Sequence, residues 1–194
     1  MLGGKYDMEK GVILYQSKYG ATKKYASWLE EATGFDCMET PNATVAAVKQ
    51  YETIILCGGI YASGIAGLSF LKKNMKELTG SKIFVFCVGA SPYDEGAFHE
   101  IKAHNMTGIL QEVPLFYGRG AWNESNRGMW DESRMTFVDR TLCKLLRKSV
   151  AKKDASTYEP WMKALMCAAG QSCDWTDKRY LHPLLERWKD TTVG

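Results

Sequence analysis

The chain has 194 residues, 45% of them hydrophobic and 24% charged, a composition typical of a globular domain with a well-buried core. Its net charge is +3, from 25 basic and 22 acidic residues, and so mild an excess does not indicate nucleic-acid binding. We predict one domain over residues 1–194 and no nucleic-acid partner.

The sequence offers no sign of export or of a membrane span. It has no uninterrupted apolar stretch of about 18 residues, and residues 1–10 carry charges of both signs without an apolar signal segment. We therefore expect a cytoplasmic protein whose six cysteines are free thiols, because no CxxC pair is present. A bridge or half of a metal site at Cys167 and Cys173 is the alternative. The histidines lack ligand spacing, and no metal site is predicted.

Short apolar runs alternate along the chain with segments of helical periodicity, which is typical of a parallel sheet covered by helices on both faces. Right-handed crossovers favour the strand order 2-1-3-4-5, so we predict an α/β fold with a doubly wound five-stranded parallel sheet. The predicted strands are Gly11–Gln16, 35–39, 53–58, Lys82–Gly89 and 113–117. Helices are predicted around 25–32, 44–49, 68–78 and Glu95–Asn105.

The regular alternation ends after the fifth strand. Residues 118–133 are rich in glycine, asparagine and tryptophan without any period, and we interpret them as an insertion. A helix is predicted at 134–150. Residues 152–194 form a predicted C-terminal helical extension, with helices at 159–169 and 182–188.

The most informative segment is the junction after the first strand, where GVILYQ leads through SKYGAT into an amphipathic helix. Ser17 and Thr22 can donate hydroxyl hydrogen bonds, Gly20 allows a tight turn, and the helix N-terminus attracts an anion. The segment lacks both the GK[ST] ending of a nucleoside-triphosphate loop and the GxGxxG of a dinucleotide site. The phosphate of flavin mononucleotide (FMN) fits better, and an ordinary strand-to-helix turn is the alternative.

Two further loops are expected to meet the first, because the ligand of a doubly wound sheet lies beyond the carboxyl ends of the strands, where the strand order reverses. Their glycines let the backbone approach a planar ring, and Tyr61 or Tyr93 either stacks on that ring or only caps the sheet. Asp94 is expected to cap the following helix. The predicted cofactor-binding residues are Ser17, Lys18, Tyr19, Gly20, Ala21, Thr22, Gly59, Ile60, Tyr61, Ala62, Ser63, Gly64, Gly89, Ala90, Ser91 and Tyr93.

The first loop resembles that of the flavodoxin family, which reads approximately T/S-x-T/Y-G-x-T. Ser17, Tyr19, Gly20 and Thr22 stand in the matching places. The resemblance implies noncovalent binding of FMN, with a role in electron transfer or as a small flavin-dependent oxidoreductase. It also implies a redox partner protein or a small-molecule substrate.

The second half of the chain resembles the flavodoxin-type protoporphyrinogen oxidase group. The matching features are the pair Asp139-Arg140 in the helix after the fifth strand and the run CDWTD at 173–177. The insertion and the region 156–169 depart from that group. The resemblance implies an enzyme that oxidises a porphyrinogen or another hydrophobic substrate.

The residues themselves name no catalytic group, because the sequence shows no paired carboxylates, nucleophile elbow or cysteine-histidine arrangement. A binding or regulatory module that keeps the fold without a redox role is therefore the alternative function. The insertion carries Trp122, Arg127 and Trp130, and we expect it to control the access of a partner or substrate rather than to hold the cofactor.

A cluster of basic residues lies at the end of the predicted helix 134–150 and just beyond it. Contact with a membrane surface is one explanation. The sequence favours the other, a solvated helix end whose cations complement the helix dipole. The cluster consists of Lys144, Arg147, Lys148, Lys152 and Lys153.

Overall fold

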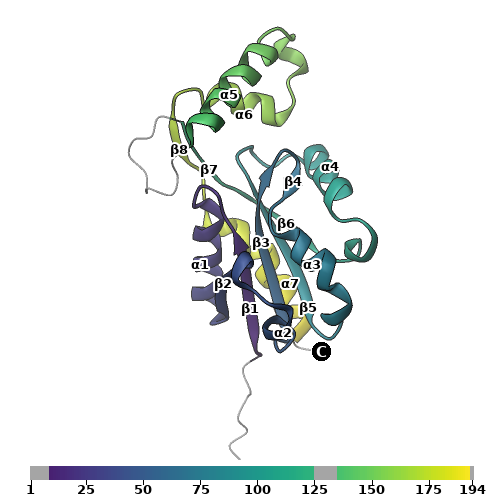
Figure 1. Cartoon of the computed structure of the whole chain (residues 1–194). Helices are drawn as coiled ribbons and strands as arrows, with labels where there is room; N and C mark the ends of the chain where they lie inside the picture. Colours follow the sequence, from purple (N-terminus) through teal and green to yellow (C-terminus); the bar gives the residue numbers. More distant parts are fainter. Residues whose placement is uncertain (1–8, 125–134, 193–194) are drawn as a thin grey trace, which may run out of the picture.

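The computed structural model describes residues 9–124 and 135–192. Five parallel strands form a sheet in the order β2-β1-β3-β5-β6, which confirms the predicted topology (Figure 1). The strands are β1 Gly11–Gln16, β2 Asp36–Glu39, β3 Thr53–Tyr61, β5 Lys82–Gly89 and β6 Leu115–Arg119. In the parallel register, Val12 of β1 lies opposite Asp36 of β2 and Ile54 of β3.

Strand β3 is three residues longer than the prediction of 53–58, because it continues into a hairpin. Its last residues, Ile60 and Tyr61, pair antiparallel with Ile65 and Gly64 of the short strand β4 (Gly64–Ile65). Strand β6 lies two residues later than the prediction of 113–117. Both differences extend the sheet at the carboxyl ends of its strands.

Helices cover both faces of the sheet, because alternate side chains of each strand point to opposite sides. In β1, Val12 and Leu14 join the hydrophobic cluster under one set of helices, whereas Ile13 joins the cluster under the other set. The first face is covered by α2 Val45–Val48, α3 Leu68–Asn74 and α4 Glu95–Asn105. The second face is covered by α1 Ala21–Thr33 and α7 His182–Thr192.

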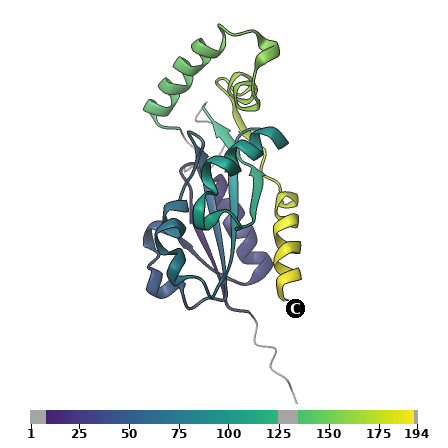
Figure 2. The same cartoon turned by 90° about the vertical axis from the view of Figure 1, so that its right-hand side faces the viewer.

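The end of the C-terminal extension is part of the core beside the sheet. Leu184 of α7 is fully buried, and Leu181 just before this helix is 2% exposed. The ring of Trp188 packs edge-on against Phe35 with 5.0 Å between centroids, and its indole nitrogen donates to Glu9 at 2.9 Å. The helix expected at 182–188 is therefore confirmed and longer, and it covers the same sheet face as α1 (Figure 2).

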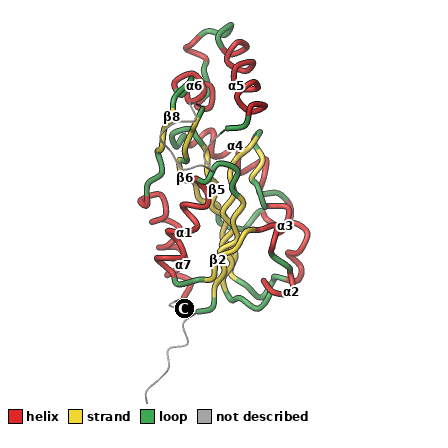
Figure 3. Tube along the Cα trace, turned by 60° about the vertical axis from the view of Figure 1, so that its left-hand side comes forward, coloured by secondary structure: helices red, strands yellow, loops and turns green. Residues whose placement is uncertain are grey.

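The helices α5 (Phe137–Val150) and α6 (Pro160–Cys167) form a separate lobe beyond the carboxyl ends of the sheet strands (Figures 1 and 2). Two short antiparallel strands, β7 (Ala121–Asn123) and β8 (Ser172–Asp174), connect this lobe with the rest of the chain (Figure 3). The hydrophobic cluster inside the lobe consists of Met135, Cys143, Val150, Met162 and Leu165.

The lobe also contains an ion pair that is largely shielded from solvent. The guanidinium of Arg147 in α5 donates two hydrogen bonds to the carboxylate of Glu124, whose side chain is 5% exposed. The Arg147 Nε donates to the carbonyl of Leu165 in α6 at 2.8 Å. Since Glu124 directly follows β7, this pair joins the two helices to the strand that leads into the lobe.

Residues 118–133 are not uniformly irregular, contrary to the sequence interpretation. Residues 118 and 119 belong to β6, and 121–123 form β7. The prediction failed because β7 pairs with β8, about fifty residues further along the chain, and such a short nonlocal pair leaves no local pattern. Residues 125–133 of this segment, with Arg127 and Trp130, lie outside the described residues. In the described part of the chain, no helix is long and apolar enough to cross a membrane.

Candidate functional site

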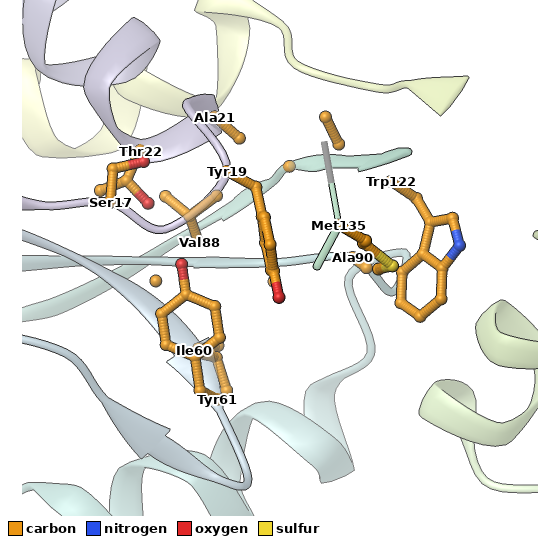
Figure 4. Close-up of a pocket in the computed structure, with 14 residues that line it drawn as sticks. Ser17, Tyr19, Ala21, Thr22, Ile60, Tyr61, Val88, Ala90, Trp122 and Met135 are labelled. Atoms are coloured by element: carbon orange, nitrogen blue, oxygen red, sulfur yellow. The ribbon is translucent and has the colours of Figure 1, made fainter. Parts of the chain in front are cut away.

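A pocket of about 110 Å³ lies where β1, β3 and β5 end, at the point where the order of the strands reverses (Figure 4). This is the position at which doubly wound proteins bind their ligands. The predicted residues that line the pocket are Ser17, Tyr19, Ala21, Thr22, Gly59, Ile60, Tyr61, Gly89 and Ala90. The lining is completed by Val88, Gly120, Ala121, Trp122 and Met135.

The loop between β1 and α1 has the features of an anion site. Gly20 occupies the N-cap position of α1 with φ +81°, a left-handed conformation that glycine adopts at little cost, and as a glycine it supplies no side-chain cap. The first turn of α1, which the structure describes fully, contains no acidic residue. Its leading N–H groups lack intrahelical acceptors and attract negative charge.

The hydroxyl oxygen of Ser17 is the atom of the pocket that most strongly indicates a bound ligand. This oxygen is buried and has no hydrogen-bond partner among the residues that the structure describes. Thr22, on the first turn of α1, is only 2% exposed. A buried hydroxyl without a partner costs free energy, so its persistence beside an uncapped helix N-terminus fits a site that receives an acceptor such as phosphate.

Two tyrosine rings occupy the middle of the pocket. Tyr19 and Tyr61 meet edge to face, with 6.1 Å between ring centroids, and Tyr19 stands between Tyr61 and the pair Trp122 and Met135 (Figure 4). The hydroxyl of Tyr61 accepts a hydrogen bond from the backbone N–H of Lys18 at 2.9 Å. Burial raises the pKa of both tyrosines, and the neighbouring Asp139 carboxylate raises that of Tyr19 further, so both phenols are neutral.

The loop after β3 is a two-residue hairpin turn under conformational strain. Ala62 and Ser63 have φ values of 47° and 64°, the left-handed region in which side chains other than glycine are disfavoured. The side chain of Asn105, at the end of α4, holds this turn. Its amide nitrogen donates to the Ser63 carbonyl at 2.7 Å, and its amide oxygen accepts the N–H of Ile65 at 2.9 Å.

Strand β6 holds the loop that follows β5. The Tyr117 hydroxyl donates to the carbonyl of Ser91 at 2.6 Å, and the Arg119 Nε donates to the carbonyl of Ala90 at 3.1 Å. The guanidinium of Arg119 also lies 4.0 Å from the ring centroid of Trp175, in the CDWTD run. Through Trp175, that run therefore contacts Arg119, which holds one of the pocket loops. Tyr93, in contrast, is 53% exposed and does not line the pocket.

An ion pair connects the first loop to the lobe. Lys18 Nζ donates to the Asp139 carboxylate at 2.7 Å, and the Thr136 hydroxyl donates to the same carboxylate at 2.6 Å. Partial burial alone would raise the pKa of Asp139, but hydrogen bonds from Lys18, Thr136 and Tyr19 lower it to about 2. Asp139 is thus ionised at neutral pH and fixes the first turn of α5 to the loop between β1 and α1.

The structure leaves some predicted residues outside the pocket and adds others. Those that do not line it are Lys18, Gly20, Ala62, Ser63, Gly64, Ser91 and Tyr93, although several hold its loops in place. The insertion begins at the pocket itself, since 120–122 line it. Gly120 is required there, because a Cβ atom would lie 2.9 Å from Val88 and 3.4 Å from Ala21. The expected role of the insertion, to control the access of a partner or substrate rather than to hold the cofactor, stays a prediction.

Sequence reasoning missed Met135 and Asn105, and it assigned Trp122 to the access of a partner or substrate rather than to the lining of the cofactor pocket. Met135 and Trp122 reach the pocket from the segments that enter the lobe, and Asn105 acts from the far end of a helix. The run GRGAW directly after a strand was the available signal for Gly120 and its neighbours, because small residues there permit close packing at the carboxyl edge.

The sheet order and the position of the pocket define a doubly wound α/β protein with its site at the topological switch point. The chain belongs to the flavodoxin domain family, whose model matches residues 12–157. A search among curated proteins gave no match.

Several solved structures are similar in fold. The Trp repressor binding protein from Bacillus subtilis is 14% identical, with a TM-score of 0.44 over 58% of this chain and 84% of that one. The WrbA-like flavodoxin from Agrobacterium tumefaciens is 17% identical, with a TM-score of 0.42 over 64% and 88%. A flavoprotein in complex with FMN from Lactobacillus acidophilus is 14% identical, with a TM-score of 0.40 over 57% and 92%.

Proposed function

We propose that this protein binds FMN noncovalently and acts in electron transfer or as a small flavin-dependent oxidoreductase. The observation that carries the proposal is the buried hydroxyl of Ser17, which has no partner in the described part of the chain and lies next to the uncapped N-terminus of α1. Membership in the flavodoxin domain family supports the same cofactor. FMN is favoured over a dinucleotide because the pocket offers one compact anion site.

The residues present fit each part of this cofactor. Ser17, Thr22 and the leading N–H groups of α1 would hold the phosphate. Gly59 and Gly89 line the pocket without side chains of their own, and Tyr61 would cover a planar ring bound beside them. When bound, FMN supplies one- and two-electron transfer. The chain's own contribution is to bind and orient the ring and to shield it from water.

The protein side chains of the pocket are poor proton carriers at neutral pH. Burial raises the pKa of Tyr61, and burial together with Asp139 raises that of Tyr19. Their hydroxyls therefore stay protonated and can donate or accept hydrogen bonds without acting as bases. No catalytic residue is assigned.

A narrower proposal concerns the substrate. Trp122 and Met135 form an apolar wall beside Tyr19, which would suit a flat hydrophobic molecule next to the flavin. Oxidation of a porphyrinogen, as in the protoporphyrinogen oxidase group that the second half of the chain resembles, is the reaction we propose for this wall. Consumption of a porphyrinogen by the FMN-loaded protein, followed by the fluorescence of the oxidised product, tests it.

A second candidate function is a binding or regulatory module without redox activity. One observation favours it: the Tyr61 hydroxyl already accepts the Lys18 N–H in the loop that would hold phosphate. An absorption spectrum of freshly purified protein separates the two functions. A yellow protein that releases FMN on denaturation, identified by chromatography, supports the first. Release of FAD, or a colourless protein that does not bind added FMN, overturns it.

A further inference from the structure

Helix α5 has a large apolar surface that faces solvent. Side chains on its inner side, such as Cys143 and Val150, are buried in the lobe. On the outer side, the exposed fractions are 76% for Phe137, 72% for Val138, 53% for Leu142, 59% for Leu145 and 38% for Leu146. At 3.6 residues per turn these five positions fall on one half of the helix. We call them the α5 apolar face.

Lysines border this face on one side and at its end. Lys144 and Lys148 are exposed on α5, and Lys152 and Lys153 are exposed directly after it. The acid of α5, Asp139, is paired with Lys18 and points to the loop after β1. The exposed side of α5, all of which the structure describes, therefore combines apolar side chains with positive charge and carries no carboxylate.

We propose that α5 docks on the surface of a membrane that contains anionic lipids, with its axis in the plane of the interface. A helix with leucine and phenylalanine on one face and lysines beside them has the two properties that such binding requires. Its 14 residues are too short to cross a bilayer, which needs about 20. The apolar face sinks into the interface while the lysines contact the headgroups.

The charge pattern selects a membrane over a second copy of the chain. A symmetric dimer through the α5 apolar face would bring Lys144 and Lys148 of both copies together, and the one acid of α5, Asp139, is already paired with Lys18. The sequence alone favours a solvated helix end. In the structure, however, Arg147 forms an ion pair with Glu124, and the remaining lysines lie beside an apolar face that is exposed to solvent. Burial of this face at a membrane surface would be favourable. Since α5 lies beyond the carboxyl ends of the strands, docking turns the pocket end toward the membrane (Figure 1).

Flotation of the full-length protein with vesicles tests this proposal. We expect binding to vesicles of phosphatidylcholine mixed with phosphatidylglycerol and little binding to phosphatidylcholine alone. The double substitution Lys144→Gln and Lys148→Gln should lower partitioning onto the mixed vesicles roughly 30-fold. Leu142→Ser with Leu145→Ser should lower it about tenfold or more. These side chains are exposed, so the melting temperature should stay unchanged.

A matched control has the same loss of charge on the opposite part of the molecule. Lys72→Gln with Lys73→Gln, in the last turn of α3, should leave vesicle binding unchanged. Hydrogen exchange of 137–146 should slow when mixed vesicles are added. The proposal is overturned by equal binding to both kinds of vesicle, by an equal loss in the control variant, by the absence of binding, or by a lipid-free dimer that protects 137–146.

Discussion

Lys18 and Asp139 lie 121 positions apart in the sequence, yet their side chains meet at 2.7 Å. Lys18 belongs to the loop between β1 and α1, and Asp139 belongs to the first turn of α5. The pair therefore joins the candidate phosphate loop to the lobe. It also places a carboxylate close to the site where we propose that a phosphate binds.

Removal of that carboxylate should favour FMN. In Asp139→Asn, Lys18 loses its partner, and the negative charge that opposes an incoming phosphate is gone, so we expect FMN to bind about two- to fivefold more tightly. Flavin fluorescence titration measures the change. Asp154→Asn, at an exposed acid after the end of α5, is the control and should leave the affinity unaltered. Weaker binding by Asp139→Asn would show that Asp139 positions the loop for the cofactor.

The same pair makes stability depend on pH in the acid range. The pKa of Asp139 in the folded protein is about 2, below the usual value of about 3.9, so its stabilisation is present above pH 4 and disappears as the pH falls toward 2. Because Lys18 is half exposed, we expect about 1 kcal/mol of unfolding free energy. Urea unfolding of the parent and of Asp139→Asn should give a difference that shrinks below pH 4 and vanishes only once the pH has fallen below 2. A difference independent of pH would contradict this origin.

Ser17→Ala should separate folding from binding. The substitution removes a buried hydroxyl without a partner in the described structure, so the unfolding free energy should stay the same or rise by about 0.5–1 kcal/mol. FMN affinity should fall about tenfold, or 1.4 kcal/mol, because a phosphate donor is lost. Ser172→Ala removes another such buried hydroxyl outside the pocket lining and serves as the control for FMN affinity. Equal affinity in both variants would place the phosphate elsewhere.

The hairpin turn at Ala62 should become more stable with glycine. Ala62→Gly relieves a left-handed conformation and should raise the unfolding free energy by about 1 kcal/mol, measured by thermal melting. Ala43→Gly is the control with an ordinary backbone, because Ala43 has φ −79°. Glycine there raises the chain entropy of the unfolded state and removes a methyl group packed against the core, so this variant should melt lower. A lower melting temperature for Ala62→Gly would mean that its methyl group makes contacts worth more than the strain.

The strands of the main sheet were predictable because burial on both faces leaves nearly unbroken apolar runs such as 82–89. The first loop was predictable because its hydroxyl residues and its glycine lie close together in the sequence. The pocket wall formed by Trp122 and Met135 could not be predicted, because these two residues come to the pocket only through the pairing of β7 with β8 and the packing of the lobe. The role of Asn105 depends likewise on a turn about forty residues earlier.

The pairing of Asn123 with Ser172 lets the chain leave the main body and return to it at the same place. The helix that completes the sheet, α7, comes only after this return. The α5–α6 lobe is thus inserted between β6 and α7, and the five parallel strands of the sheet all precede it in the chain. During synthesis, the face of the sheet that α7 covers stays partly exposed to solvent until this last helix has been made.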